Sequence, residues 1–408
     1  MSTQTTRQSP SILVALALCM ALQMTGFIMI SPLFPRRFDS FGAGVEALGM
    51  SAMVYGLTST FTAPFIGMLA DRFGRRPIIL LALAGYVLAF SGFLFATFAW
   101  MLITLRGLAG VCTAGLLPAM MSIVGDLAPN NRRAQWIGIV NGGASAGWIG
   151  GPLLGGVLYD RFGYVVPFAV SIVMAAGALL LAIFLIHDTH SNAAHLIQAR
   201  PGWSHQLRAL PAGSIFVLLM FITFGVMFAW AFIEPQFMFY VYDDLNWTSS
   251  QLGLIMSSYG VAFMIGEFTL GQLSDRLGRK PVLVLGLALF SAQFVGLFTF
   301  RDATWIVVSF ILAGLGNALY DPALSALILD VTPAEHKAGM MGLKGTAGSL
   351  GNMLGPGLVV LFTPFTSPQV IFLMAAVMVV MLALACGLAL HIPQNIEDPH
   401  YSIKTADA

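Results

Sequence analysis

Long apolar segments recur along the entire sequence, and each is about as long as a membrane is thick. An α-helix needs roughly 20 apolar residues to cross a hydrocarbon core of about 30 Å. Spanning strands would alternate apolar and polar residues, and these segments do not. We therefore expect an all-α membrane protein with twelve transmembrane helices. They are predicted near residues 11–34, 47–68, 78–97, 100–125, 135–158, 165–186, 214–238, 251–270, 282–300, 303–328, 338–362 and 368–391.

The composition excludes several classes of protein. Hydrophobic residues make up 58% of the chain and charged residues only 9%, whereas soluble domains are about 45–50% apolar and about 25% charged. A soluble or disordered chain would need far more charge. The net charge of +1 gives no basic field for a phosphate backbone, so no nucleic-acid partner is expected.

Two further features concern the cysteines and the first apolar segment. Cys19, Cys112 and Cys386 all lie within apolar segments, and they are too few and scattered for a disulfide framework or metal site. We expect them to be small buried side chains. No small-residue cleavage pattern follows the segment from Ser11 to Phe34, so we interpret it as a retained transmembrane helix.

Basic residues predict the orientation, because cytoplasmic loops carry an excess of Lys and Arg. With both termini inside, the outside loops hold only Arg36, Arg37, Arg161 and Arg301. The chain is therefore predicted to be a multi-pass protein with both termini cytoplasmic. We further expect it to be a monomer in a bacterial inner membrane. The inside loops and ends then hold Arg7, Arg72, Arg75, Arg76, Arg132, Arg133, Arg200, Arg208, Arg276, Arg279, Lys280, Lys337 and Lys404.

The two halves of the sequence repeat. The segment from Gly67 to Pro77 reappears 204 residues later, from Gly271 to Pro281. Halves with an even number of helices keep the same orientation, so we expect them to be related by an axis along the membrane normal, with the substrate path between them. The same offset aligns Pro118 with Pro322, Asp126 with Asp330, Pro129 with Pro333, and Gly151-Pro152 with Gly355-Pro356.

The predicted domains follow from this repeat. Residues 1–186 form an N-terminal six-helix bundle, and residues 214–391 form a C-terminal six-helix bundle. A cytoplasmic linker at 187–213 joins them, and a cytoplasmic tail at 392–408 follows.

Three motifs carry a resemblance to a known family. The repeated pattern Gly-x-Leu-Ala/Ser-Asp-Arg-x-Gly-Arg-Arg/Lys resembles the signature of the major facilitator superfamily. Leu105-Arg106 with Gly107 and Gly110 resembles its helix 4 motif. The glycines from 138 to 156 resemble the helix 5 motif of its antiporters. The whole chain is most similar to the twelve-helix drug:proton antiporters, which implies the major facilitator fold, with two pseudo-symmetric six-helix halves.

The resemblance also implies a cytoplasmic latch that holds the halves together when the carrier opens outward. Asp71 can cap the following helix or pair with Arg75, and Gly74 permits a backbone conformation closed to other residues. Asp126 is the expected local partner of this charged loop motif. The alternative is a basic anchor with incidental charges. The predicted latch comprises Asp71, Arg72, Gly74, Arg75, Arg76, Asp126, Asp275, Arg276, Arg279 and Lys280.

The predicted fifth helix is rich in glycine, and spacings of four place many glycines on one stripe. Small residues let neighbouring backbones approach closely, and Pro152 should bend the helix. We expect a conformational role, the alternative being packing alone. The motif comprises Gly138, Gly147, Gly151, Pro152, Gly155 and Gly156.

Charges inside the predicted helices are candidates for proton coupling and substrate binding, because a charge at a helix centre costs about 2.5–3.5 kcal/mol on insertion scales. Arg106 matches the superfamily arginine implicated in proton transfer, the alternative being a structural pair. Glu234 and Asp321 each precede a proline; the alternatives are an interfacial carboxylate and a carboxylate bonded in a kink. Glu267 lies near a cytoplasmic loop, and Lys344 can neutralise one of the acids.

The first predicted helix departs from the family pattern. Many drug antiporters carry an acid there, whereas this chain has Gln23 and Thr25. Every embedded acid lies in the C-terminal half, so this chain has no counterpart of the acid that the family carries in its first helix.

The motifs that the sequence lacks indicate which energy source would drive transport. It has no metal-ligand cluster, nucleophile–base arrangement or Walker-type phosphate loop, so no cofactor and no enzymatic activity are expected. A proton gradient is favoured because carboxylates moved between dry and wet sites shift their proton affinity readily.

The sequence favours one function over two others. The leading hypothesis is a proton-coupled exporter of amphipathic drugs or toxic compounds that works by alternating access, with the bilayer, a small-molecule substrate and the proton as partners. The alternative is an exporter or importer of one metabolite, such as a sugar, amino acid or siderophore. A non-transporting receptor or scaffold leaves the repeated loop motif and the embedded charges unexplained.

Overall fold

A computed structural model describes residues 5–129, 132–187, 214–271, 273–332 and 336–390. Each of the twelve predicted segments coincides with one helix or with consecutive helices, and the described residues contain no strand. The prediction of an all-α fold is therefore confirmed. The predicted linker, beyond His187, and the predicted tail lie outside the described residues.

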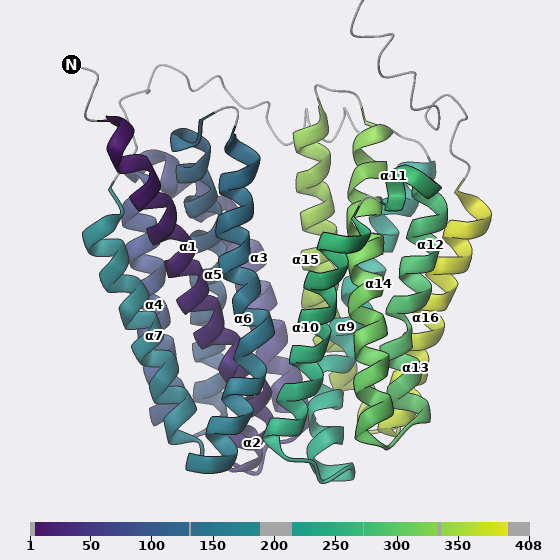
Figure 1. Cartoon of the computed structure of the whole chain (residues 1–408). Helices are drawn as coiled ribbons and strands as arrows, with labels where there is room; N and C mark the ends of the chain where they lie inside the picture. The colour runs from purple at the N-terminus through teal and green to yellow at the C-terminus, as the bar shows by residue number, and fades with distance from the viewer. Residues whose placement is uncertain (1–4, 130–131, 188–213, 272, 333–335, 391–408) are drawn as a thin grey trace, which may run out of the picture. The chain divides into compact units, whose positions relative to one another are not determined.

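The helices of the N-terminal half are connected by short turns (Figure 1). The chain order is α1 (Thr5–Ile30), the 3-10 turn η1 (Ser31–Leu33), α2 (Phe34–Asp39), α3 (Val45–Phe73), α4 (Arg75–Phe95), α5 (Ala99–Leu127), α6 (Arg133–Phe162) and α7 (Val165–Leu185).

The C-terminal half repeats this order with more interruptions. The chain order is α9 (Ser214–Phe239), the π-helical turn η3 (Tyr240–Asp244), α10 (Ser249–Leu270), α11 (Leu273–Leu277), α12 (Arg279–Phe290), α13 (Ala292–Thr299), α14 (Ala303–Asp330), α15 (Lys337–Phe362) and α16 (Pro368–Ala389).

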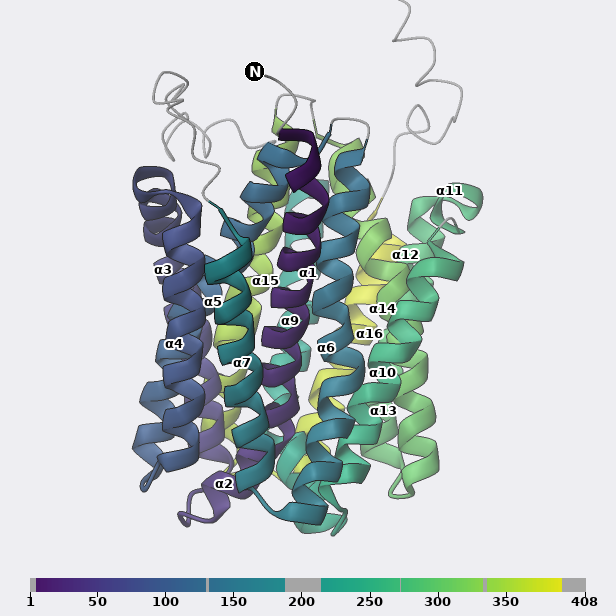
Figure 2. The ribbon, with the colours of Figure 1, turned by 60° about the vertical axis from the view of Figure 1, so that its left-hand side comes forward.

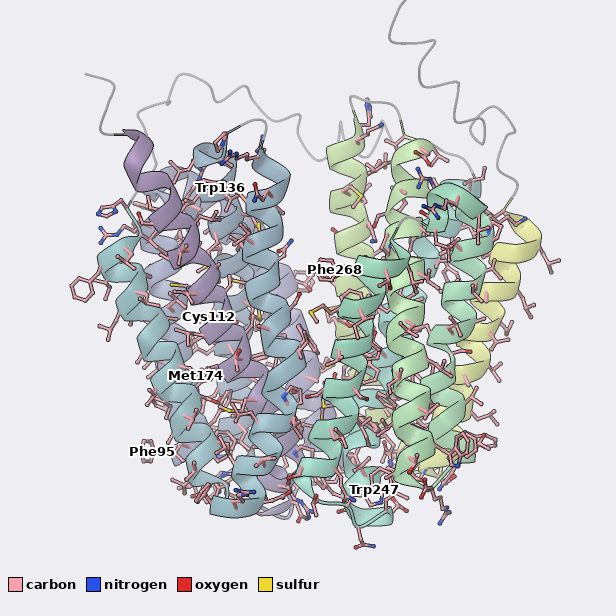
Figure 3. All side chains as sticks on the ribbon, viewed as in Figure 1. Phe95, Cys112, Trp136, Met174, Trp247 and Phe268 are labelled. Carbon is pink, nitrogen blue, oxygen red and sulfur yellow. The ribbon has the colours of Figure 1, made fainter. Side chains whose placement is uncertain are left out.

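Within the described residues, ten helical segments are long and apolar enough to cross a membrane. The other two predicted spans are α6 and α15, which are 30 and 26 residues long but rich in glycine. Large apolar side chains cover the outer surfaces of the helices. Phe95 on α4 is 73% exposed and Phe184 on α7 is 72% exposed, and Phe95 projects from its helix in Figure 3. In water such a surface would be unstable, so it fits a lipid environment.

The described helices pack as two units, which do not follow the sequence halves. The first unit contains α1 to α7 together with Phe232–Gly260 and Met353–Pro368. The second contains the first part of α9, residues Val261–Asn352 and α16. One end each of α9, α10 and α15 therefore packs with the N-terminal helices. The division into sequence halves stays a prediction.

The core of the first unit is built around α1, which lies beside α6 and α7 (Figure 2). α5 packs against α3 and α4. Phe34, Phe90 and Phe93 are fully buried, and the rings of Phe34 and Phe93 meet edge to face with centroids 5.0 Å apart. Phe34 of this aromatic core also lies against Arg106 of α5.

In the second unit, α14 packs against α12 and α13 (Figure 1). Gly286 and Gly316 permit this close approach, because a Cβ on Gly286 would lie 2.6 Å from the backbone nitrogen of Tyr320 and one on Gly316 would lie 2.8 Å from the carbonyl carbon of Leu289. Backbone contact at this range fixes α14 and therefore the position of Asp321.

Candidate functional site

Arg106 lies on α5 with its guanidinium against aromatic rings. The side chain is buried, with 7% exposure. Its Cζ atom lies 4.2 Å from the ring centroid of Phe34, 5.6 Å from that of Phe27 and 5.7 Å from that of Tyr55. Ring faces attract a cation, but they do not replace the hydration of a buried charge. An anion nearby is therefore expected.

Glu234 is the acid that interacts electrostatically with Arg106. It is half-buried on α9, in the part of that helix that belongs to the first unit. The following Pro235 lacks an amide hydrogen and interrupts the helical hydrogen bonds at this point. The two sequence-predicted charges thus interact electrostatically within one packing unit, and we call them an acid–base couple in that sense.

A chain of hydroxyl groups lies beside this couple. Tyr55 Oη lies 2.9 Å from Thr113 Oγ1, and Tyr86 Oη makes a short contact with the same threonine oxygen. Thr113 in turn donates to the Ala109 carbonyl over 2.9 Å. Gln23 on α1 is fully buried and lies against Tyr86. The N-terminal helices therefore hold a buried polar cluster without an acid of their own.

Asp321 and Lys344 form a second acid–base couple, in the second unit. Lys344 Nζ on α15 donates to Asp321 Oδ1 on α14 over 2.6 Å. It also donates to Ser325 Oγ over 2.6 Å, and Ser325 itself donates to the Asp321 carbonyl over 2.8 Å. Ser325 lies one turn after Asp321, so α14 presents both acceptors on one face.

This second couple lines a cavity of about 380 Å³ within the second unit. Glu267, by contrast, is an exposed residue on α10 that interacts electrostatically with Asp321. The structure therefore places Asp321, Lys344 and Glu267 near one another, and it places Arg106 and Glu234 together elsewhere. The walls of the cavity comprise Thr223, Val226, Met227, Tyr320, Asp321, Leu324, Met341, Lys344, Gly345, Gly348, Ser349 and Asn352.

The repeated loop motif adopts the same turn in both copies. Gly74 has a φ of 94° and Gly278 a φ of 89°, a backbone conformation that favours glycine. Asp71 and Asp275 lie in the preceding helices, and their side chains lie outside what the structure describes. The turn between α3 and α4 and the turn between α11 and α12 therefore require the same residue at the same place.

An ion pair follows each turn. Arg75 pairs with Asp126 at the end of α5 and donates to the Ser122 carbonyl over 3.0 Å. In the second copy, Arg279 Nε donates to Asp330 Oδ2 at the end of α14 over 2.5 Å. The alignment at an offset of 204 residues predicts this correspondence.

The remaining basic residues of the motif have different surroundings. Arg76 Nη2 donates to the Ile183 carbonyl of α7 over 2.8 Å. Arg72 and Arg276 are exposed, and Lys280 is half-exposed. These residues fit an anchor at a membrane surface as well as a latch, so the role of the latch stays a proposal.

The glycines of α6 face two different neighbours. A Cβ on Gly147, Gly151 or Gly155 would meet the backbone of α1 between Met24 and Met29. A Cβ on Gly156 would instead meet the Ser249 backbone at the start of α10. Gly138 has open space, with nothing within 4 Å of an added Cβ.

Pro152 lies where α6 meets α10. A Cβ on Gly253 of α10 would collide with the Pro152 carbonyl, and one on Gly260 would lie 2.9 Å from the Trp148 carbonyl. Ser257 Oγ accepts a hydrogen bond from the Leu153 amide over 3.2 Å. α10 thus packs closely against α6 and adds a hydrogen bond beside Pro152, which lies inside the continuous helix.

Sequence reasoning missed a capping contact at the other end of α6. Both carboxylate oxygens of Asp160 accept from the first turn of α10: Oδ1 from the Ser249 amide over 3.1 Å, and Oδ2 from the Ser250 amide over 2.8 Å. The Ser250 hydroxyl also donates to Oδ2 over 2.5 Å. Thr248 to Gln251 has the form of a capping box, which predicts that α10 begins here but does not identify Asp160 as a second cap.

The same end of the first unit holds further contacts between distant parts of the sequence. Tyr242 Oη donates to the Pro32 carbonyl over 2.7 Å. The Arg36 guanidinium stacks over the Tyr242 ring at 4.1 Å and donates to the Trp247 carbonyl over 3.4 Å. We call this set, with Asp160 and its serine partners, the α2-end closure. It joins η1 and α2 to η3 and α10.

Comparison with known proteins agrees with this architecture. The sequence model of the Major Facilitator Superfamily matches residues 16–239 and 219–404. The chain is 28% identical over 363 residues to the tetracycline resistance protein, class G, of Vibrio anguillarum, covering 85% of this chain and 88% of that protein. It is 27% identical over 342 residues to the multidrug resistance protein MdtG of Serratia proteamaculans, covering 81% and 82%.

Among solved structures, a nucleoside transporter, NupG, has the same fold. Its TM-score is 0.78 at 15% sequence identity, and the match covers 93% of this chain and 100% of that chain. The fold, the family model and the relatives together place the chain among membrane transporters. The chain belongs to the Major Facilitator Superfamily.

Proposed function

We propose that this protein is a proton-coupled exporter of amphipathic drugs or toxic compounds. One observation carries the proposal: relatives that align over more than four fifths of both chains are named as tetracycline resistance or multidrug resistance proteins. The buried acids add a means of coupling, because a carboxylate moved between dry and wet surroundings changes its proton affinity.

The mechanism follows from the two acid–base couples. When Glu234 is ionised, it compensates the buried charge of Arg106; when it takes a proton, Arg106 loses that compensation and the surrounding helices lose an attraction. The same argument applies to Asp321 and Lys344. Protonation therefore changes which helix arrangement is favoured, and alternating access converts that change into substrate movement.

The proposal includes a place and an orientation. The protein would lie in a bacterial inner membrane as a monomer with both termini cytoplasmic. The loop motif, with Asp71 and Asp126, would then lie on the cytoplasmic side as a latch. Exposed ion pairs contribute only about 0–1 kcal/mol each, which suits contacts that must break in every cycle.

The test is resistance together with transport. An efflux-deficient bacterial host that expresses the protein should tolerate several unrelated toxic compounds better than the empty host. Everted membrane vesicles should accumulate a fluorescent substrate when a pH gradient is imposed and lose it when a protonophore is added. Protection against no compound, with uptake of a single metabolite instead, would show a dedicated carrier.

A further inference from the structure

The cavity of the second unit places a cation and an anion at one space. Lys344 Nζ lies 2.6 Å from Asp321 Oδ1, and both residues line the cavity. Its volume of about 380 Å³ falls in the usual range of about 300–1,000 Å³ for small-molecule sites. The charged couple is therefore part of a space that can hold a ligand.

The walls suit an amphipathic molecule. Met227 and Met341 offer flexible apolar contact, while Ser349 and Asn352 add polar groups. Gly345 follows Lys344 on α15, and an added Cβ there would meet nothing within 4 Å. Apolar surface, polar groups and free space thus occur around a single ion pair.

The exposure of the pair leaves it accessible to a ligand. The Asp321 side chain is 43% exposed and that of Lys344 is 13% exposed. A ligand with one charge is attracted by one member of the pair and repelled by the other. A ligand with an acidic and a basic group can compensate both members at once, so the pair itself discriminates between charge types.

The possible ligands also differ in whether they bind together with a proton or exclude it. An anion on Lys344 would remove the cation from Asp321 and so favour proton uptake, which makes anion and proton bind together. An exporter driven by proton entry needs the opposite, because substrate and proton must exclude each other. A basic group held against Asp321 keeps that carboxylate ionised and meets this requirement.

The charged groups near Asp321 also favour a basic ligand group at this carboxylate, as competition between substrate and proton requires. Glu267 on α10 interacts electrostatically with Asp321 and adds negative charge, whereas Lys344 on α15 adds positive charge. Tyr320, the neighbour of Asp321 on α14, also lines the cavity. A basic ligand group near Asp321 is therefore favoured once the ligand's acidic group occupies Lys344.

We infer that this cavity binds amphipathic zwitterions, with the ligand's acidic group on Lys344 and its basic group on Asp321. The inference rests on the proposed export function and names the class of substrate for it. It assigns to Lys344 the selection of the acidic group, and to Asp321 the competition between substrate and proton.

Two fluorescent scaffolds supply the test, each in three charge forms. They are Nε-dansyl-lysine and norfloxacin as zwitterions, their methyl esters as cations, and their N-acetyl derivatives as anions. Binding to the purified full-length protein is measured by fluorescence anisotropy at neutral pH. A charge-assisted hydrogen bond lost without replacement should weaken binding by about tenfold or more, so each zwitterion should bind more tightly than both of its derivatives.

Two variants separate binding from folding. Combining Asp321→Asn with Lys344→Met removes both charges and leaves no unpaired ion, so the protein should fold and bind the three charge forms about equally. Combining Asp321→Lys with Lys344→Asp keeps a reversed pair and should retain the preference for the zwitterion. Thermal unfolding of each purified variant checks that it is folded.

The inference is overturned if the methyl esters bind as tightly as the zwitterions on both scaffolds, or if no probe binds. It is also overturned if the doubly neutral variant keeps the preference. The proposed function fails in a different way, through the absence of gradient-driven export of any compound. Export of simple cations without a preference for zwitterions would contradict this inference alone.

Discussion

Arg106 and Glu234 are two charges of opposite sign that interact in the core of the first unit. Arg106 lies among three aromatic rings with 7% exposure, and Glu234 interacts with it from another helix. Removing one member of a buried pair leaves an uncompensated charge, at a cost of about 3–5 kcal/mol. Proton uptake by Glu234 would do the same reversibly, so this couple can link proton binding to a change in helix packing.

We expect Glu234→Gln to abolish transport driven by a pH gradient while measurable substrate binding remains, because the amide cannot exchange the proton. Gradient-driven accumulation in everted vesicles should fall to the background level, and binding is measured on the purified protein. Glu234→Asp, which keeps a titratable group, is the matched control. Asp321→Asn tests the second couple in the same way. If both Glu234→Gln and Asp321→Asn still transport along a pH gradient, proton coupling lies at other residues.

Asp71 and Asp275 occupy equivalent positions in the repeated motif. We expect Asp71→Asn to lower transport severely in a protein that still folds and inserts, because the latch needs the charge rather than the shape. Asp275→Asn should cause a milder loss. Vesicle transport measures the effect, and membrane yield with thermal unfolding checks folding. Normal transport by Asp71→Asn would reduce this residue to a capping or topology role.

At the scale of helices, α6 combines a packing surface with an open surface. A Cβ at Gly155 would collide with the Met29 carbonyl of α1, whereas one at Gly138 would meet nothing within 4 Å. A backbone atom cannot move aside as a flexible side chain can. The two glycines therefore have different consequences within the same helix.

We expect Gly155→Ala to destabilise the protein by roughly 1–3 kcal/mol, the usual range for overpacking a well-packed interior. Gly138→Ala is the matched control; it should leave stability unchanged or raise it, since alanine favours a helix by up to about 1 kcal/mol over glycine. Thermal unfolding in detergent measures both variants. Equal destabilisation by the two substitutions would contradict the packing role of Gly155.

The caps of α10 and α14 offer a second comparison between elements. Asp160 caps α10 from α6, whereas Asp302 caps its own helix by accepting from the Thr304 amide over 2.9 Å. We expect Asp160→Ala and Asp302→Ala each to lower stability by about 1 kcal/mol. Only Asp160→Ala should also change the rate of transport, because only its cap belongs to the α2-end closure. A transport rate unaltered by Asp160→Ala would limit this residue to a structural cap.

The sequence predicts helices well here because each span satisfies a local requirement of length and apolarity. Gly74 and Gly278 were also predictable, since a tight turn in a repeated motif needs a residue free to adopt positive φ. Which helix supplies the partner of a buried charge was not predictable. Glu234 interacts with Arg106 from a helix that is distant in sequence. Asp321 and Lys344 lie only 23 residues apart, on the consecutive helices α14 and α15, but the sequence does not show which acid Lys344 would neutralise.

The α2-end closure escaped prediction for the same reason. Asp160 and Tyr242 look like ordinary residues at helix ends, and their partners Ser249, Ser250 and Pro32 lie far away in the chain. A capping box predicts that a helix begins, but it does not identify an additional cap from another helix. Such contacts depend on the arrangement of the whole unit.

At the scale of the whole molecule, the repeat is visible in matching local structures. Both copies have a glycine turn with positive φ followed by an arginine–aspartate pair. Both also have a glycine-rich helix at the equivalent place, α6 and α15. These two helices are less hydrophobic than the ten other spans. The protein therefore has twelve transmembrane helices only if α6 and α15 also cross the membrane.

We expect both ends of α6, and both ends of α15, to lie on opposite sides of the membrane. Single cysteines at the exposed positions Arg132 and Arg161 flank α6, and Lys337 and Ser367 flank α15. The background replaces Cys19, Cys112 and Cys386, which are buried and unpaired, with alanine. Membrane-impermeant maleimide should label Arg161→Cys and Ser367→Cys in intact cells, and it should label Arg132→Cys and Lys337→Cys only in everted vesicles. A retained resistance phenotype confirms that each variant is assembled. If the two ends of α6 or of α15 are labelled from one side, that helix does not span, the inside and outside loops that follow it exchange places, and the predicted orientation is wrong.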